Sequence, residues 1–278
     1  MPLNWIWAGI IMAGMVAALI GFYPQVENFF VFFPDKKLEC HPSDYHLNYE
    51  TVNFVAQDGT RLHGWFFPSP DDGPVVLFSH GNAGNISHRL ENVKGLVDQG
   101  LGVFLYDYRG YGKSKGRPSE KGIYEDGLAA YDHLTGQKGV PPERIVCFGR
   151  SLGAAVAMET ALHRKTRGLI MESGFTSANQ MAGILLFFRP LSRLLPEHYN
   201  NIGKIPHVDV PKLIIHGDAD DLIPFTMGET LYRAASAPKY FFPIKGAGHN
   251  DTYVVGGRRY FETVARFAED ARLNADFS

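Results

Sequence analysis

Ser151 is the candidate for nucleophilic chemistry, because it lies in the segment Gly-Arg-Ser-Leu-Gly at 149–153, which fits the pattern G-x-S-x-G. The apolar run 145–148 precedes this motif and two alanines follow it, which predicts a turn from a strand into a helix. Such a turn holds a serine hydroxyl clear of the sheet. A glycine-rich turn without chemistry is the alternative, and the strand-like and helix-like flanks favour the nucleophile.

A serine hydroxyl needs a base to take its proton and an acid to orient that base. When the nucleophilic serine lies at a turn from a strand into a helix, the expected order along the chain is serine, acid, histidine. Three aspartates follow the apolar run 213–215, at Asp218, Asp220 and Asp221. His249 comes last, in a glycine-rich turn. The order predicts Ser151 as nucleophile and His249 as base, and it leaves the acid open among the three aspartates.

Acyl chemistry also needs hydrogen-bond donors for the oxyanion, worth about 3 kcal/mol each. The backbone amide of Leu152, directly after the nucleophile, is the first predicted donor. The second is expected in the glycine-rich loop 79–85, where we choose Asn82, with Ala83 as the next candidate. A phosphate cradle is the alternative for this loop, but it lacks a P-loop lysine and G-x-G-x-x-G spacing.

The remaining histidines and the cysteines indicate no metal or cofactor. The 11 histidines include no HExxH pair and no cluster with cysteine. We expect His216 to be structural and His80 to orient a loop. Cys40 and Cys147 are too few for a disulfide framework, and Cys147 lies in an apolar run that predicts a buried free thiol.

Short apolar runs alternate with segments of helical length from residue 51 onward. The predicted strands are 51–56, 61–67, 75–78, 103–106, 145–148, 169–171, 213–215 and 240–243. The predicted helices are 86–99, 119–135, 152–165, 225–236 and 251–272. This alternation predicts an α/β fold with a mostly parallel sheet and helices on both faces.

About 40 residues separate the strand ending near Glu172 from the strand beginning near Lys212, too many for a simple loop. We predict a small helical cap inserted at about 174–208. Its apolar run 184–188 is predicted to bind substrate through Leu186 and Phe187. The alternative is that these side chains only pack the cap onto the domain.

The N-terminal segment differs from the rest of the chain, since no residue from Trp5 to Tyr23 is charged. As a helix it would span about 28 Å, close to a bilayer core. We predict a transmembrane anchor at 1–24, a connector at 25–50 and the main domain at 51–278. A cleaved signal peptide is the rival, but no basic residue precedes the run.

Two further expectations concern membrane orientation and partners. Lys36 and Lys37 follow the apolar segment, which places the main domain in the cytoplasm of a single-pass membrane protein. Small residues recur every four positions on the predicted helix and predict pairing into a homodimer: Gly9, Ala13, Ala17 and Gly21. The net charge of -2 and the lack of a basic stripe argue against nucleic acid as a partner.

The motifs together resemble a known family. They are Ser-His-Gly-Asn-Ala-Gly-Asn (79–85), Asp-Tyr-Arg-Gly-Tyr-Gly-Lys-Ser (107–114), 149–153, His-Gly-Asp-Ala-Asp-Asp-Leu-Ile-Pro (216–224) and Gly-Ala-Gly-His-Asn-Asp (246–251). In this order they resemble the membrane-anchored α/β-hydrolase-domain proteins, which are similar to serine hydrolases acting on acyl esters and thioesters. The resemblance implies the α/β-hydrolase fold and identifies Asp220 as the acid, three residues after the glycine of His-Gly.

The resemblance leaves the substrate open, since these proteins share their catalytic machinery and differ in the cap. We expect hydrolysis of carboxylic esters or thioesters of lipid-like, small-molecule or acylated substrates, without a cofactor. A serine peptidase or amidase is the alternative within hydrolases. A catalytically silent, membrane-tethered binding module is the alternative from another class. Asp107 and Arg109 are expected to serve the loop at the sheet edge structurally.

Overall fold

The computed structural model describes residues 7, 9–12, 14, 31–185 and 198–270. The chain divides into two compact units, Met1–Phe33 and Pro34–Ser278. The second unit holds the sheet, and the short strand β1 (Phe33–Pro34) lies at the boundary. Just after it, the amide of Asp35 donates a hydrogen bond to Gly84 O in β5 (Ala83–Gly84).

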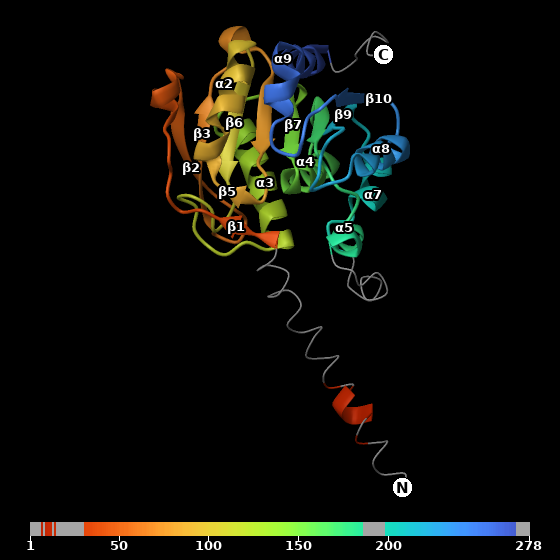
Figure 1. The fold of residues 1–278 in the computed structure, drawn as a ribbon. Helices are drawn as coiled ribbons and strands as arrows, with labels where there is room; N and C mark the ends of the chain where they lie inside the picture. The colour runs from red at the N-terminus through yellow and green to blue at the C-terminus, as the bar shows by residue number, and fades with distance from the viewer. Residues whose placement is uncertain (1–6, 8, 13, 15–30, 186–197, 271–278) are drawn as a thin grey trace. The chain divides into compact units, whose positions relative to one another are not determined.

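Eight strands form one sheet in the order β10-β9-β8-β7-β4-β6-β3-β2 (Figure 1). Their bounds are β2 (Glu50–Val55), β3 (Arg61–Phe67), β4 (Val75–Ser79), β6 (Gly102–Asp107), β7 (Ile145–Arg150), β8 (Gly168–Glu172), β9 (Lys212–Gly217) and β10 (Lys239–Ile244). Only β3 runs against the direction of the other strands in this sheet, so the sheet is mostly parallel. All eight predicted strands are confirmed, with ends that match or are shifted by at most two residues.

The residue pattern of each strand matches its place in the sheet. β2 lies at the edge and alternates buried Val52 and Phe54 with exposed side chains. The inner strands β4, β6 and β7 are buried along their whole length, which explains their continuous apolar runs. The hairpin from β2 to β3 turns at Gly59, whose φ of +84° favours glycine.

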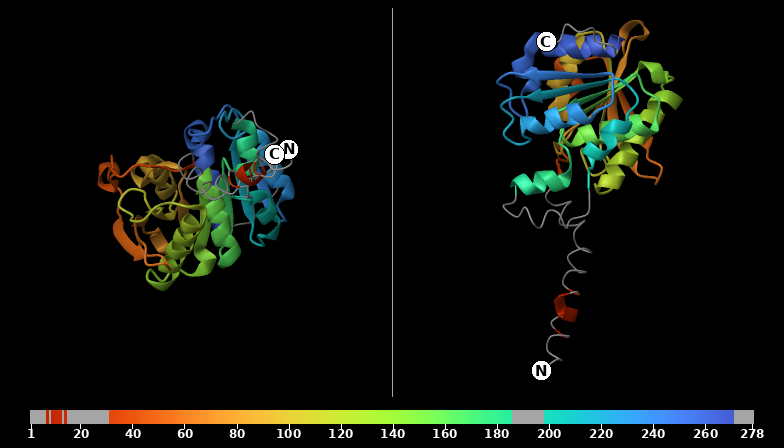
Figure 2. Two further views of the ribbon diagram at one scale, coloured as in Figure 1. Left: turned by 90° about the horizontal axis from the view of Figure 1, so that it is seen from below. Right: turned by 90° about the vertical axis from the view of Figure 1, so that its right-hand side faces the viewer.

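Helices cover both faces of the sheet (Figure 2). α2 (Leu90–Asp98) and α9 (Thr252–Asp270) pack together on one face. The other face carries α3 (Glu120–Gly136), α4 (Leu152–His163) and α8 (Phe225–Ala234). α4 is mostly apolar, in keeping with its place between the sheet and α3. The predicted helices are therefore confirmed, except that the first begins with a 3₁₀ helix, Ile86–Arg89, ahead of α2. The free, buried thiol of Cys147 is confirmed as well.

The stretch between β8 and β9 contains the helices α5 (Ala178–Leu185) and α7 (Asn201–Lys204). A 3₁₀ helix, Ile205–His207, follows α7 directly. The predicted cap insertion at 174–208 covers these elements, and its boundaries stay a prediction. Leu186 and Phe187, the predicted substrate-binding residues, lie outside the described residues.

The predicted location in a membrane is contradicted. Within the described part of the chain, no helix is long and apolar enough to cross a bilayer, which requires about 20 apolar residues. Of the predicted anchor, only residues 7, 9–12 and 14 are described, with helical backbone. The assignment of the main domain to the cytoplasm, which assumed a single-pass anchor, falls with it.

Two other N-terminal predictions fall mainly outside the described residues. Ala13, Ala17 and Gly21, three of the four small residues expected to pair two helices, are not described, so the homodimer stays untested. Of the predicted connector at 25–50, residues 31–50 are described, and they include the buried Phe32 and the exposed Phe33.

Candidate active site

Ser151 lies at a sharp turn between β7 and α4, at the carboxyl edge of the sheet. Its backbone has φ 54° and ψ -119°, a left-handed conformation that costs a non-glycine residue on the order of 1–3 kcal/mol. The Ser151 amide donates a hydrogen bond of 2.8 Å to the carbonyl oxygen of Glu172 in β8. The neighbouring strand therefore helps to hold the strained turn in place.

The two glycines of the motif are required by close backbone contacts. A Cβ atom on Gly149 would lie 2.1 Å from the carbonyl oxygen of Gly153, and a Cβ on Gly153 would lie 2.0 Å from that of Ser79. Backbone atoms cannot move aside as flexible side chains do, so only glycine fits at either position. Leu152 follows as the first residue of α4, where the positive end of the helix dipole favours an oxyanion.

His249 lies between the serine and one of the three aspartates. Its Nε2 is 3.0 Å from Ser151 Oγ, and its Nδ1 is 2.8 Å from Asp220 Oδ2. Because a carboxylate only accepts, Nδ1 carries the proton and Nε2 presents a lone pair to the serine hydroxyl. All three side chains are buried. The structure thus brings together the three residues expected to form the catalytic triad.

The surroundings of Asp220 keep its carboxyl group ionised. Burial alone would raise the pKa of Asp220, but the nearby ring of His216 and the hydrogen bond with His249 outweigh burial and lower the pKa below its usual range. Oδ1 also accepts hydrogen bonds from the amides of Leu222 and Ile223, at 3.0 and 2.8 Å. An ionised Asp220 can stabilise the positive charge that His249 acquires when it takes a proton.

The neighbouring aspartates occupy different surroundings. Asp218 is exposed, and its Oδ1 accepts a 2.6 Å hydrogen bond from the amide of Gly246. Asp221 is exposed as well. His216, expected to be structural, is fully buried and its Nε2 lies 2.9 Å from the Ile223 carbonyl oxygen. The same nitrogen is 3.4 Å from Asp220 Oδ2, so the shorter contact, to the backbone, is the stronger one.

The loop expected to supply the second oxyanion donor lies against the nucleophile. A Cβ atom on Gly81 would be 3.6 Å from Ser151 Cβ, so the backbone there is in contact range of the serine. Asn82 and Ala83 follow directly. This placement is compatible with an oxyanion donor from either amide, and the assignment to Asn82 stays a prediction.

A buried ion pair beside the triad was missed in the sequence. Arg150, the second residue of the motif, has its Nε 3.4 Å from Glu172 Oε1, and both side chains are buried. Glu172 also accepts hydrogen bonds from the hydroxyls of Thr252 and Tyr260. The available signal was a glutamate at the end of an otherwise apolar strand, where a buried carboxylate needs a partner.

Asp107 and Arg109 connect loops outside the triad, in line with the structural role expected for them. The Asp107 carboxylate accepts a 3.0 Å hydrogen bond from the amide of Ile86. The Arg109 guanidinium pairs with Asp126 at 2.9 Å and with Asp58 at 2.7 Å. Neither residue belongs to the group formed by Ser151, His249 and Asp220.

Two further features of the described residues lie away from this site. A groove of about 710 Å³ runs between the edge strand β2 and α3, at the far end of the sheet order from β10. Its ionic groups include Asp132 and Arg164, which already pair with each other. A small, mostly exposed cluster consists of Asp35, Glu39 and His88, whose potential metal-binding atoms lie within 4.8 Å of one another. We assign no function to it.

Comparisons with known proteins identify the class to which this fold and site belong. A family model described as serine aminopeptidase, S33, matches residues 71–204. The chain is 37% identical over 290 residues to the alpha/beta hydrolase domain-containing protein WAV2 of Arabidopsis thaliana, covering 95% of this chain and 92% of that protein. The chain therefore belongs to the α/β-hydrolase family.

Other similar proteins include bacterial ones. The uncharacterized protein Rv2307c of Mycobacterium tuberculosis is 40% identical over 265 residues, which cover 95% of this chain and 94% of that protein. Among solved structures, the Pyrococcus furiosus esterase Pf2001 has a TM-score of 0.72 at 20% identity, covering 85% of this chain and 97% of that chain. An esterase from Exiguobacterium antarcticum has a TM-score of 0.61 at 18% identity, covering 79% and 99%. The structural likeness shows the fold, and family membership supports hydrolase activity.

Proposed function

We propose that the protein is a serine hydrolase that cleaves carboxylic ester or thioester bonds through an acyl-enzyme. The observation that carries this proposal is the position of His249, with one ring nitrogen 3.0 Å from Ser151 Oγ and the other 2.8 Å from Asp220 Oδ2. A serine, histidine and aspartate linked in this way form a nucleophile, a general base and the group that orients the base.

In the first half of the reaction, Ser151 Oγ attacks the carbonyl carbon of the substrate while its proton passes to His249 Nε2. The carbonyl oxygen becomes an oxyanion, held by the amides of Leu152 and Asn82. Asp220 fixes the tautomer of His249 and stabilises the imidazolium. His249 then gives its proton to the leaving oxygen or sulfur, and the acyl group stays on Ser151.

In the second half, water attacks the acyl-enzyme while His249 Nε2 takes one of its protons. The tetrahedral intermediate collapses, the proton returns to Ser151 Oγ, and the carboxylic acid is released. The cycle needs no metal or redox cofactor, because each step moves only an acyl group and protons. A small-molecule or acylated substrate with an apolar acyl chain fits the apolar run predicted in the cap.

A peptidase or amidase is the second candidate. The matching family model is described as a serine aminopeptidase, and the same residues can attack an amide carbonyl. The ester assignment rests on the sequence resemblance given above. A silent binding module is the third reading, and the linked serine, histidine and aspartate argue against it.

The test of serine catalysis is fluorophosphonate labelling of the full chain. Ser151→Ala should abolish labelling and lower turnover by about 10⁴-fold or more. Ser173→Ala is a matched control, because Ser173 is also a buried serine with positive φ at the end of a strand. Labelling that persists in Ser151→Ala, or that is lost in Ser173→Ala alone, would refute Ser151 as the nucleophile.

The choice between esters and amides is made with two sets of chromogenic substrates. p-Nitrophenyl esters of graded chain length report esterase activity, and aminoacyl p-nitroanilides report aminopeptidase activity. We expect kcat/KM to be far higher for the esters. Efficient hydrolysis of the anilides with weak ester hydrolysis would replace the esterase proposal with the peptidase.

A further inference from the structure

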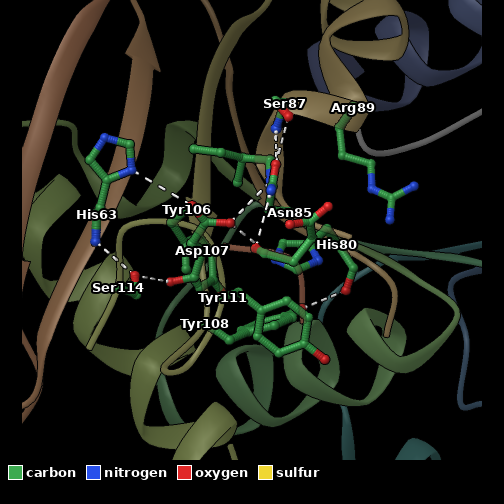
Figure 3. Close-up of polar contacts among 12 residues, drawn as sticks. His63, His80, Asn85, Ser87, Arg89, Tyr106, Asp107, Tyr108, Tyr111 and Ser114 are labelled. Carbon is green, nitrogen blue, oxygen red and sulfur yellow. Dashed lines mark hydrogen bonds and ion pairs between the residues drawn. The ribbon is translucent and has the colours of Figure 1, made fainter. Parts of the chain in front are cut away.

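Four consecutive carbonyl oxygens in the loop against Ser151 each accept a hydrogen bond from a side chain. Figure 3 draws the donors His80, Arg89, Tyr108 and Tyr111, with the bond between Tyr108 and His80 as a dashed line. The pairs are Tyr108 Oη to His80 O at 2.7 Å, His80 Nδ1 to Gly81 O at 2.7 Å, Tyr111 Oη to Asn82 O at 2.7 Å and Arg89 Nη2 to Ala83 O at 2.5 Å. Side chains from three separate segments therefore hold the backbone of one short loop.

Bonds to the carbonyl groups also fix the directions of the amide groups. In a trans peptide the C=O and the N–H of the next residue lie in one plane and point in opposite directions. The bond from His80 to Gly81 O therefore sets the direction of the Asn82 N–H. The bond from Tyr111 to Asn82 O does the same for the Ala83 N–H. These are the two amides considered for the oxyanion.

The side chains that make these bonds are themselves tightly packed. The ring centroid of His80 is 4.4 Å from that of Tyr108 and 5.2 Å from that of Tyr111, and all three residues are buried. The loop that carries the two tyrosines is held by Ser114, whose hydroxyl donates to Asp107 O at 2.7 Å. Such packing leaves the three side chains little freedom to reorient.

His80 and Tyr108 both have the protonation state that lets them donate a hydrogen bond at neutral pH. Burial, helped by the positive charge of Arg89, lowers the pKa of His80 to about 3, so its ring is neutral. A neutral ring bonded to a carbonyl oxygen through Nδ1 must carry its proton there. Burial raises the pKa of Tyr108, so its hydroxyl keeps its proton.

We propose that His80 and Tyr111 are positioning residues that aim the amides of Asn82 and Ala83 at the oxyanion, and that Tyr108 is a positioning residue that holds His80 in place through its bond to His80 O and its ring contact. This inference rests on the proposed serine hydrolase function and adds to it the residues that organise the oxyanion hole. An oxyanion hole works because its donors are already oriented before charge develops. Side-chain bonds to the carbonyls of successive peptides provide that orientation without occupying the amides.

Tyr108→Phe and Tyr111→Phe each remove one hydroxyl and leave the ring. Tyr106→Phe is the matched control: Tyr106 is also buried, but its hydroxyl lies 2.8 Å from the side chain of Ser79 and bonds to no carbonyl of the loop. All three variants should lose a similar amount of stability in urea. Only Tyr108→Phe and Tyr111→Phe should lower kcat on p-nitrophenyl butyrate, by about tenfold, with KM within about twofold of wild type.

A boronic acid provides a second readout, because its adduct with Ser151 places an anionic oxygen in the oxyanion hole. The affinity for butylboronic acid should fall in Tyr108→Phe and Tyr111→Phe in proportion to kcat/KM, and it should stay unchanged in Tyr106→Phe. Equal kcat in the three variants, or losses confined to KM, would overturn the positioning role while leaving the serine hydrolase intact.

Hydrogen exchange tests the loop without any catalysis. In the Ser151→Ala background, adding Tyr111→Phe should speed exchange of the amides at 82–84 by about tenfold, and adding Tyr106→Phe should not change it. Unchanged exchange with Tyr111→Phe would sink the inference whatever the activity. A wild type that neither hydrolyses esters nor binds the boronic acid would instead refute the proposed function, and the inference with it.

Discussion

Arg150 donates a hydrogen bond of 2.9 Å from Nη2 to the carbonyl oxygen of His249, 99 residues farther along the chain. The residue just before the candidate nucleophile thus holds the backbone of the candidate base. Arg150 is in turn paired with the buried carboxylate of Glu172. The separation of Ser151 and His249 therefore depends on an ion pair that does not itself react.

Arg150→Met should destabilise the protein, because it leaves Glu172 buried without its cation. Removing one partner of a buried ion pair costs about 3–5 kcal/mol, whereas an exposed pair contributes about 1 kcal/mol or less. Arg164→Met is the matched control, since Arg164 pairs with the half-exposed Asp132. Urea unfolding curves would compare the two variants.

The double variant Arg150→Met/Glu172→Gln separates the loss of the ion pair from the loss of the hydrogen bond to His249. Removing both charges should recover part of the stability lost in Arg150→Met, while kcat stays low because the carbonyl of His249 has lost its donor. A double variant with wild-type kcat would show that the bond to His249 does not position the base.

Asp220→Asn should reduce kcat/KM far more than Asp218→Asn or Asp221→Asn, by about 10⁴-fold if it acts as in other triads. The reason is geometric, since Asp220 is the aspartate whose carboxylate binds His249 Nδ1. An asparagine there would favour the wrong tautomer of the histidine. Steady-state kinetics on one ester with all three variants checks the assignment, which is wrong if another aspartate proves the most sensitive.

The buried His80 should make stability fall as the pH is lowered. Its pKa is about 3 in the folded protein because burial disfavours the imidazolium. In the unfolded chain the pKa of a histidine is about 6.5. Between these values the unfolded chain binds the extra proton. Stability is therefore lost as the pH falls, by up to about 1.4 kcal/mol per pH unit.

His80→Gln should flatten this dependence, because glutamine takes up no proton in either state. The free energy of unfolding would be measured in urea at several pH values between 4 and 7. His163→Gln, a change at an exposed histidine, is the control. Equal slopes in wild type and His80→Gln would contradict the prediction.

Phe187→Ala and Leu186→Ala test the role predicted from sequence for the cap. If these side chains bind acyl chains, the variants should lose activity on long-chain esters and keep it on acetate esters. Each methylene that reaches such a surface is worth about 0.8 kcal/mol, or up to about fourfold in kcat/KM. Equal losses on both esters, with a lower Tm, would show that the run only packs the cap.

Periodicity predicted the α/β fold, and chain order led to Ser151 and His249, which lie 3.0 Å apart in the structure. Inner strands of a parallel sheet are buried on both faces, so their apolar runs stand out in the sequence. The motif at 149–153 is recognisable because Gly149 and Gly153 lie in close backbone contacts where only glycine fits. The identification of Asp220 needed a family pattern, since three nearby aspartates look alike in sequence.

Other features could not be read from the sequence, because they depend on contacts between distant segments. The place of Glu172 at the end of an apolar strand indicates that it needs a partner, but nothing local identifies Arg150 as that partner. Nothing near Tyr111 indicates that it binds Asn82. The membrane prediction failed for a related reason. An uncharged run of 19 residues, Trp5–Tyr23, meets the compositional requirement for a span, and composition alone does not establish that the chain forms one.

The backbone conformation of Ser151 serves catalysis at a cost in stability. Its φ of 54° is one that glycine adopts freely. Ser151→Gly should therefore unfold at a higher temperature than Ser151→Ala and even than the wild type, while hydrolysing nothing. A mutagenesis screen that selects only for thermostability would then favour inactive variants at this position. The serine persists only as long as turnover is selected, so a stable protein from such a screen needs an activity assay before it is kept.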